Sequence, residues 1–142
     1  MRQVQRARAM QSFAGMELNA PPHVPDRQLE APTRQLQLQQ EAAPLRQAAG
    51  QAPAGHTAKT LVKLRGLRVV LMVLERGSRI PEHTAEADLS LQCLRGRVAL
   101  SVQGRRFELA AGELLSLARE LPHDVEALED AELLLTLGDP ER

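Results

Sequence analysis

The chain has few of the residues that form disulfides and aromatic clusters. Its 142 residues include one cysteine, two phenylalanines and no tryptophan or tyrosine. Because Cys93 has no second cysteine to pair with, a small secreted scaffold held by internal disulfides is excluded, and we expect a cytoplasmic protein. Phe107 is the only aromatic residue after residue 57. The core must therefore be held together by aliphatic side chains.

Net charge and long apolar runs are also lacking. Eighteen Lys and Arg residues face eighteen Asp and Glu residues, which gives a formal net charge of +0 at pH 7. Without an excess of positive charge we expect no nucleic-acid binding. No segment reaches the roughly 20 consecutive apolar residues that a membrane-spanning helix needs, so we expect no membrane association.

The first residues, MRQVQRARAMQSFAGM, lack the apolar segment of a secretory signal. They are rich in arginine and free of acidic residues, as transit peptides are, but three glutamines and the lack of an apolar face argue against that interpretation. A second interpretation is that translation begins at Met16.

Composition divides the chain near residues 55–59. Residues 1–57 carry ten glutamines and six of the nine prolines, and their apolar residues are scattered singly. So little apolar area cannot offset the entropy lost on ordering, and we expect a disordered or partly helical tail. Residues 58–138 carry runs of leucine and valine and are long enough for one modest core. Residues 139–142 form the C-terminal end.

Within the tail, residues 27–49 contain leucines that could mark one or two helical turns. Pro32 and Pro44 interrupt this pattern. Because proline removes a backbone donor and clashes with the preceding turn, we expect no continuous helix. The segment is either a partner-binding or dimer-strapping arm or a solvated linker, and its composition favours the linker.

After Thr57 the pattern becomes that of short strands. Residues 67–75, LRVVLMVLE, are an unbroken apolar run, as expected for a strand buried on both faces. Alternation in residues 89–93 places Leu89, Leu91 and Cys93 on the inward face. Turn signals recur about every 7 to 10 residues, the spacing typical of an all-β sandwich or barrel.

The segment from Gly112 to residue 137 has a competing interpretation. Leucine, glutamate and alanine dominate it and favour helix, so a helical hairpin broken at Pro122 is the alternative. The turn signal at Glu129 and Asp130 leaves pieces too short to form independent helices. We therefore predict strands.

Two glycine-to-histidine spacings carry a family resemblance. Five residues separate Gly77 from His83, and Gly96 follows this pair at the spacing that a known family motif has. Gly112 and His123 form a second glycine-to-histidine pair. In these residues the sequence resembles the cupin family, whose two motifs form facing strands of a small double-stranded β-helix, or jelly-roll, barrel. The resemblance covers about residues 58–138. It implies an all-β cupin-like barrel, and a homodimer formed through sheet packing.

The chain departs from both cupin motifs at positions that matter for metal binding. The first motif has a second histidine and a glutamate where this chain has Ala85 and Leu89. In the second motif, Ala118, Glu120 and Ala127 replace a proline, a glycine and an asparagine. The family pattern gathers three or four ligands around a divalent ion such as Mn, Fe, Ni or Zn.

His83 and His123 are therefore candidate ligands of an incomplete metal site, or a general acid and base. The alternative is a pair of hydrogen-bonded, inert residues at the barrel mouth. A carboxylate from Glu86, Asp88 or Asp124 would complete a facial triad, but strict alternation from His83 turns Glu86 and Asp88 outward.

Other residues have plainer interpretations. Cys93 is either a pocket nucleophile or, as free cysteines more often are, a small buried residue among leucines. The remaining histidines, His23 and His56, fall in the expected linker and should be solvated. Four charged residues are expected on a solvated outer face, namely Arg97, Arg105, Arg106 and Glu108.

The sequence is compatible with three classes of function, and it contains no complete catalytic site. The first is a ligand-binding or structural module whose apolar pocket is lined by Ala85, Leu89, Leu91 and Cys93, with a small organic molecule as ligand. The second is a metal-dependent oxygenase or isomerase. The third is a regulatory protein whose tail binds a partner.

Overall fold

The computed structural model describes residues 26–139, and the predictions for residues 1–25 fall outside it. In this range two helices, α2 (Asp26–Leu29) and α3 (Leu38–Gln51), precede nine strands. The strands are β1 (His56–Lys63), β2 (Arg68–Leu74), β3 (Arg79–His83), β4 (Leu89–Arg95), β5 (Arg97–Val102), β6 (Arg105–Ala110), β7 (Leu114–Leu117), β8 (His123–Ala127) and β9 (Ala131–Leu137). Neither helix is long and apolar enough to cross a membrane.

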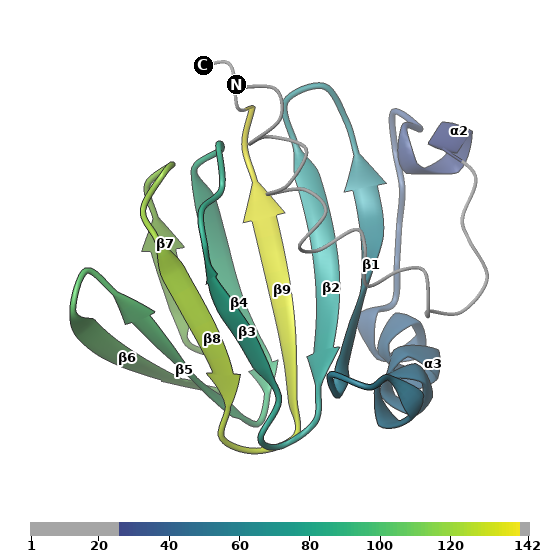
Figure 1. Cartoon of the computed structure of the whole chain (residues 1–142). Helices are drawn as coiled ribbons and strands as arrows, with labels where there is room; N and C mark the ends of the chain where they lie inside the picture. Colours follow the sequence, from purple (N-terminus) through teal and green to yellow (C-terminus); the bar gives the residue numbers. More distant parts are fainter. Residues whose placement is uncertain (1–25, 140–142) are drawn as a thin grey trace.

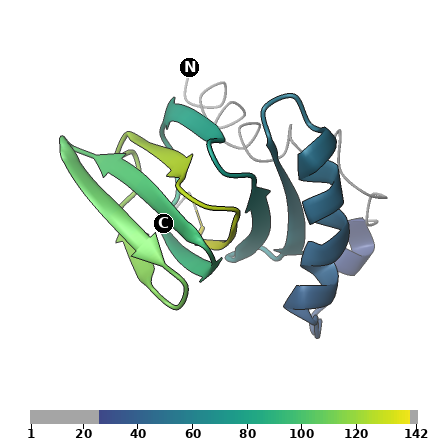
Figure 2. The ribbon, with the colours of Figure 1, turned by 90° about the horizontal axis from the view of Figure 1, so that it is seen from below.

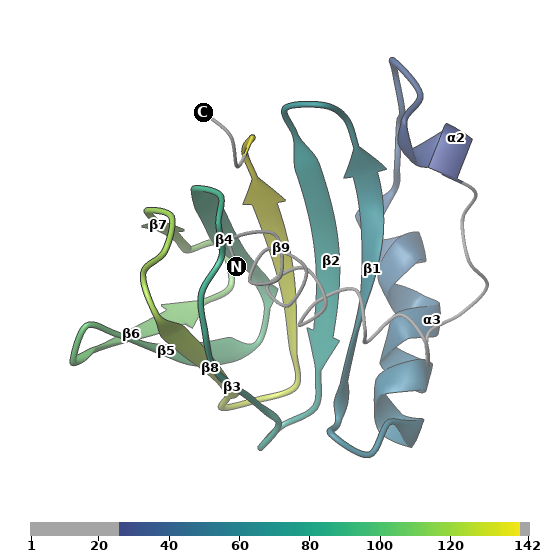
Figure 3. The same cartoon turned by 45° about the horizontal axis from the view of Figure 1, so that its top comes forward.

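The strands form two sheets that face each other across one core (Figure 1). The larger sheet has the order β1-β2-β9-β4-β7 and the smaller one β3-β8-β5-β6, with every pair antiparallel. Figure 3 shows β5, β6 and β8 on one side and β1, β2 and β9 on the other. The predicted all-β barrel is confirmed. The helical hairpin considered after Gly112 is wrong, because β7, β8 and β9 occupy that segment.

Aliphatic side chains fill the space between the sheets, as the shortage of aromatics required. On β4, Leu89, Leu91 and Cys93 are buried while their neighbours are partly exposed, so the predicted inward alternation is confirmed. Leu100 on β5 and Leu135 on β9 complete the same apolar cluster from both sheets. Phe107 only packs against its margin.

A close backbone approach fixes the turn between β4 and β5. Gly96 has a φ of +77°, and a Cβ atom there would lie 2.1 Å from the carbonyl oxygen of Asp130. Only glycine combines this left-handed conformation with so near a neighbour. The β4–β5 connection therefore packs closely against the connection before β9.

Helix α3 corrects the linker prediction for residues 27–49. The helix runs from Leu38 to Gln51 and includes Pro44 in its interior. Its first turn is capped by Gln37, whose side-chain oxygen accepts from the backbone N–H of Gln39 at 2.8 Å. Of the two states expected for the tail, the partly helical one describes residues 38–51.

Tertiary packing explains how α3 tolerates its proline. Pro44 lies on the exposed face, whereas the opposite face buries Ala42, Leu45 and Ala49. These side chains pack on the outer face of the larger sheet, against Leu61, Leu71 and Val73. Figure 2 shows the helix lying along the outside of that sheet. Burial of this stripe offsets the lost backbone hydrogen bond, because most helical stability in proteins comes from such packing.

This arrangement also accounts for β2. The prediction that residues 67–75 contain a strand buried on both faces is confirmed, since the last five residues of β2 are all buried. Met72 and Leu74 face the barrel core, and Leu71 and Val73 face α3. An ion pair between Lys59 on β1 and Glu41 on α3, 2.7 Å long, borders the same contact.

We expect the substitution L45A to lower the free energy of unfolding by about 2–5 kcal/mol, because a fully buried leucine would leave a cavity under the helix. The matched variant Q47A changes an exposed position of the same helix and should cost under about 0.5 kcal/mol. Urea unfolding of both variants measures the difference. Equal, negligible effects would mean that α3 does not pack on the sheet.

Candidate functional site

The two sheet strands that carry the cupin-like histidines lie side by side. On β3 and β8, His83 and His123 are directly opposite each other in the ladder. Their ring centroids are 4.3 Å apart, and the ring planes are inclined by 58°. His123 is almost wholly buried, with 2% of its surface exposed, and it also lies opposite Val102 of β5. The fold thus brings the two predicted candidates into contact.

Both imidazoles are oriented by the backbone in the same way. The Nδ1–H of His83 donates to the carbonyl of Pro81 at 3.0 Å, and that of His123 donates to the carbonyl of Leu121 at 2.9 Å. A carbonyl can only accept, so each ring carries its proton on Nδ1 when neutral. Nε2 is then the acceptor nitrogen of each ring, which is the orientation that metal-bound histidines adopt.

Burial favours the neutral form of His83. Desolvation lowers the pKa of its imidazole below 6.5, and the neighbouring His123 adds to this effect. The Pro81 carbonyl and the Asp124 carboxylate oppose it. Near neutral pH the ring is therefore a hydrogen-bonding base without charge.

The other members of the predicted pocket belong to the packed core. Ala85, Leu89, Leu91 and Cys93 have 0–5% of their surfaces exposed and lie in one apolar cluster. The Cys93 thiol donates to the carbonyl of Arg95 at 3.3 Å, and burial raises its pKa. These properties fit a packing role for Cys93 and oppose a nucleophilic one.

The nearby carboxylates have partners of their own. Asp88 accepts from the backbone N–H and the guanidinium of Arg119, at 2.9 and 3.1 Å, and these bonds hold its pKa below the usual range. Asp124 accepts from the backbone N–H of Ser101 at 3.0 Å. Between residues 26 and 139, no group of three or more His, Cys, Asp or Glu side chains is placed to hold a metal ion. Two imidazoles alone do not fit the divalent metal that the cupin resemblance implies.

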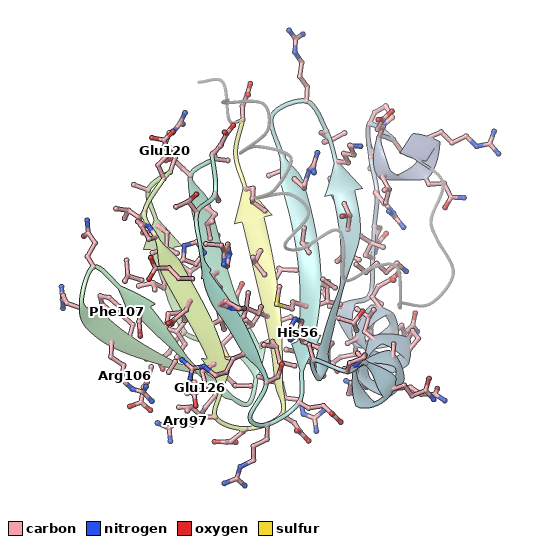
Figure 4. The ribbon with its side chains drawn as sticks, viewed as in Figure 1. His56, Arg97, Arg106, Phe107, Glu120 and Glu126 are labelled. Carbon is pink, nitrogen blue, oxygen red and sulfur yellow. The ribbon has the colours of Figure 1, made fainter. Side chains whose placement is uncertain are left out.

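Glu120 has a backbone conformation that is typical of glycine. Glu120, which Figure 4 labels, occupies the glycine position of the second cupin motif. Its φ is +66°, in the left-handed region. Its N–H donates to the carbonyl of Ala85 at 2.7 Å, which ties the β7–β8 loop to the segment after His83. The conformation that glycine adopts freely is here imposed on a side chain that disfavours it.

The four charged residues expected on a solvated face are all exposed. Arg97 and Glu108 form an exposed ion pair of 2.8 Å across β5 and β6. The guanidinium of Arg105 lies 4.8 Å from the centre of the Phe107 ring. Figure 4 shows Arg97, Arg106 and Phe107 on the smaller sheet.

His56 is not in a solvated linker, as the composition suggested, but begins β1. Its Nδ1 lies 2.6 Å from the hydroxyl of Ser78, which itself donates to the carbonyl of Ala54 at 2.7 Å. Partial burial lowers the pKa of His56 below 6.5. The second linker histidine, His23, lies outside the described residues.

A hollow of about 420 Å³ lies at one end of the larger sheet and was not anticipated. Three hydroxyls line it, from Ser90, Ser116 and Thr136, which are neighbours across β4, β7 and β9. Asp88 borders the hollow, and neither candidate histidine does. The sequence signal was the row of small hydroxyl residues at outward positions.

A second feature missed by the sequence analysis is the buried carboxylate of Glu132. Glu132 is the second residue of β9, and it contacts Arg46 of α3 and Arg95 of β4. An isolated acid within the apolar run AELLLTL was the available signal. Its two partners lie far away in the chain, so the cluster could not be assembled from spacing.

Comparison with known proteins identifies the fold. No family model matches the chain, and no curated protein matches it in sequence. Among solved structures, the conserved SPY1581 protein of unknown function from Streptococcus pyogenes has a TM-score of 0.63 and 21% identity, over 87% of this chain and 99% of that one. KdgF from Halomonas sp. has a TM-score of 0.57 and 20% identity, over 59% and 78% of the two chains.

An RmlC-like cupin from Methanocaldococcus jannaschii, described as a double-stranded β-helix, has a TM-score of 0.56 and 16% identity over 61% of this chain and 83% of that one. The span from the start of β1 to the end of β9 is a little more than half of the present chain, and these two shorter matches cover 59% and 61% of it. The match to the S. pyogenes protein covers a larger share of this chain.

We expect E120G to raise the free energy of unfolding by about 1 kcal/mol, because glycine removes the strain of the left-handed backbone. The variant A118G, in the same loop at a position without positive φ, should instead lower it slightly. Chemical unfolding of the two variants gives both values. Destabilisation by E120G would show that the residue is not strained.

Stability should fall as the pH is lowered through 6.5, because His83 and His56 have lowered pKa values in the folded protein. Below 6.5 the unfolded chain binds more protons than the folded one, so the free energy of unfolding decreases. Urea titrations between about pH 7 and 5 avoid most carboxylate protonation. H83Q and H56Q should each flatten part of this slope, and a flat wild-type profile would contradict the assignment.

Proposed function

We propose that this chain, which has the cupin fold, is a non-enzymatic binding module with a small organic ligand and a second copy of the chain as its expected partners. The observation that carries the proposal is the make-up of the barrel interior. His83 and His123 are its paired polar groups, and aliphatic residues occupy the positions of the remaining cupin ligands.

The packing around the histidines supports a binding role over a catalytic one. A cupin metal centre needs at least a third protein donor, and here Ala85 and Leu89 supply only hydrocarbon. Both residues are buried among the core leucines and valines. Asp88, the carboxylate next to Leu89 in sequence, is bound to Arg119. Burial lowers the pKa of the His83 imidazole, and a neutral imidazole nitrogen can accept a hydrogen bond.

One observation favours the second candidate, a metal-dependent oxygenase or isomerase. The backbone carbonyls of Pro81 and Leu121 hold both Nδ1 atoms, and this leaves Nε2 as the nitrogen that would bind an ion. Metal-binding histidines are commonly oriented by a bond of this kind. The two candidates therefore differ in one measurable property, the metal content of the native protein.

We expect protein purified without a histidine tag to contain far less than one equivalent of Mn, Fe, Ni or Zn by elemental mass spectrometry. Two imidazoles without a carboxylate provide too few ligands for tight binding. H83A should leave this low content unchanged. Near-stoichiometric metal in the wild-type protein that is lost in H83A would support the enzyme and contradict the binding module.

The double variant A85H/L89E is the matched positive control. It restores the two donors of the first cupin motif, so equilibrium dialysis should show metal binding at least tenfold tighter than in the wild-type protein. Circular dichroism shows whether the variant folds, since both substitutions place polar groups at buried positions. The wild-type measurement decides the question even if the variant does not fold.

A further inference from the structure

A small cavity under helix α3 has the features of a second binding site, separate from the histidine pair. It has a volume of about 130 Å³ and lies where β2 ends and β9 begins. Five charged residues line it, namely Arg46, Glu75, Arg95, Asp130 and Glu132. Because one water molecule occupies about 30 Å³ in the liquid, the cavity can take a small organic molecule.

Glu132 is the central residue of this cavity. Its side chain is 2% exposed, and it lies in the ladder between Val73 of β2 and Arg95 of β4. Its Oε2 atom accepts from Nη1 of Arg46 at 2.5 Å and from Nη1 of Arg95 at 3.3 Å. Its Oε1 atom is also buried, yet it accepts no hydrogen bond from any of the described residues. A buried carboxylate oxygen requires such a donor.

Arg46 and Arg95 provide hydrogen-bond donors for an anionic group of a ligand. Each guanidinium carries five N–H donors, and the contact with Glu132 uses one nitrogen of each. The side chains of Arg46 and Arg95 are 37% and 55% exposed, so an anionic group can reach them from solvent. Planar guanidinium groups match the geometry of a carboxylate.

The charged groups that line the cavity limit the kind of ligand that it can bind. Three carboxylates and two guanidinium groups line the cavity, so positive and negative groups are both present and close together. The two arginines would repel a simple cation. A simple anion would be repelled by the carboxylates of Glu75, Asp130 and Glu132. A zwitterion satisfies both sets, with its ammonium group donating to Glu132 and its carboxylate accepting from Arg95. We infer that the cavity binds a small α-amino acid.

Calorimetric titration of the full-length protein with three small probes tests this inference. Glycine carries both charged groups, methylamine only the cation and acetate only the anion. Glycine should bind saturably, and methylamine and acetate should bind at least tenfold more weakly. If glycine does not bind, or if methylamine or acetate binds as tightly, the inference is wrong.

Three variants locate the site. R95Q should weaken glycine binding at least tenfold, because it removes the exposed guanidinium that meets the carboxylate. R97Q is the control, since Arg97 is an exposed arginine two residues further on that pairs with Glu108 outside the cavity. E132Q should also abolish binding, and its fold is checked by circular dichroism. If E132Q does not fold, the comparison of R95Q with R97Q decides, and equal affinities in those two variants would overturn the proposal.

Discussion

The structure depends on the burial of strand β2 between two apolar layers. Met72 and Leu74 face the barrel core, and Leu71 and Val73 face helix α3. With only one aromatic side chain near the core, contact area must come from many aliphatic groups, and covering the outer face of the sheet adds to it. The helix is thus part of the folded unit and not an appendage to it.

Much of the barrel could be predicted from the sequence because strand patterns are local. Alternation placed the inward residues of β4, and glycine turns separated the strands from β4 to β7. The double burial of β2 was also predictable from its apolar run. The apolar run of β2 could not show which element covers the outer face of the strand. Leu45 and Leu71 belong to one buried cluster, but composition assigns Leu45 to the tail and Leu71 to the barrel.

The difference between local patterns and distant contacts also explains why the histidine pair could be predicted from the sequence and the Glu132 cavity could not. The histidine pair could be predicted because two motifs with known spacing fix His83 and His123 on neighbouring strands. The Glu132 cavity could not, because it joins a helix, a strand end and a turn through contacts distant in sequence. Proline rules likewise failed at Pro44, where tertiary packing outweighed a local penalty.

The left-handed backbone at Glu120 shows how loosely residue type and loop conformation can be linked. Where the second cupin motif has a glycine this chain has Glu120, and its main chain adopts a left-handed torsion angle that glycine favours. The loop is held by a hydrogen bond from the backbone N–H of Glu120 to the carbonyl of Ala85, in which no side chain takes part. The course of such a loop can therefore be set by backbone torsion angles and backbone hydrogen bonds, and a side chain that disfavours the conformation does not prevent it.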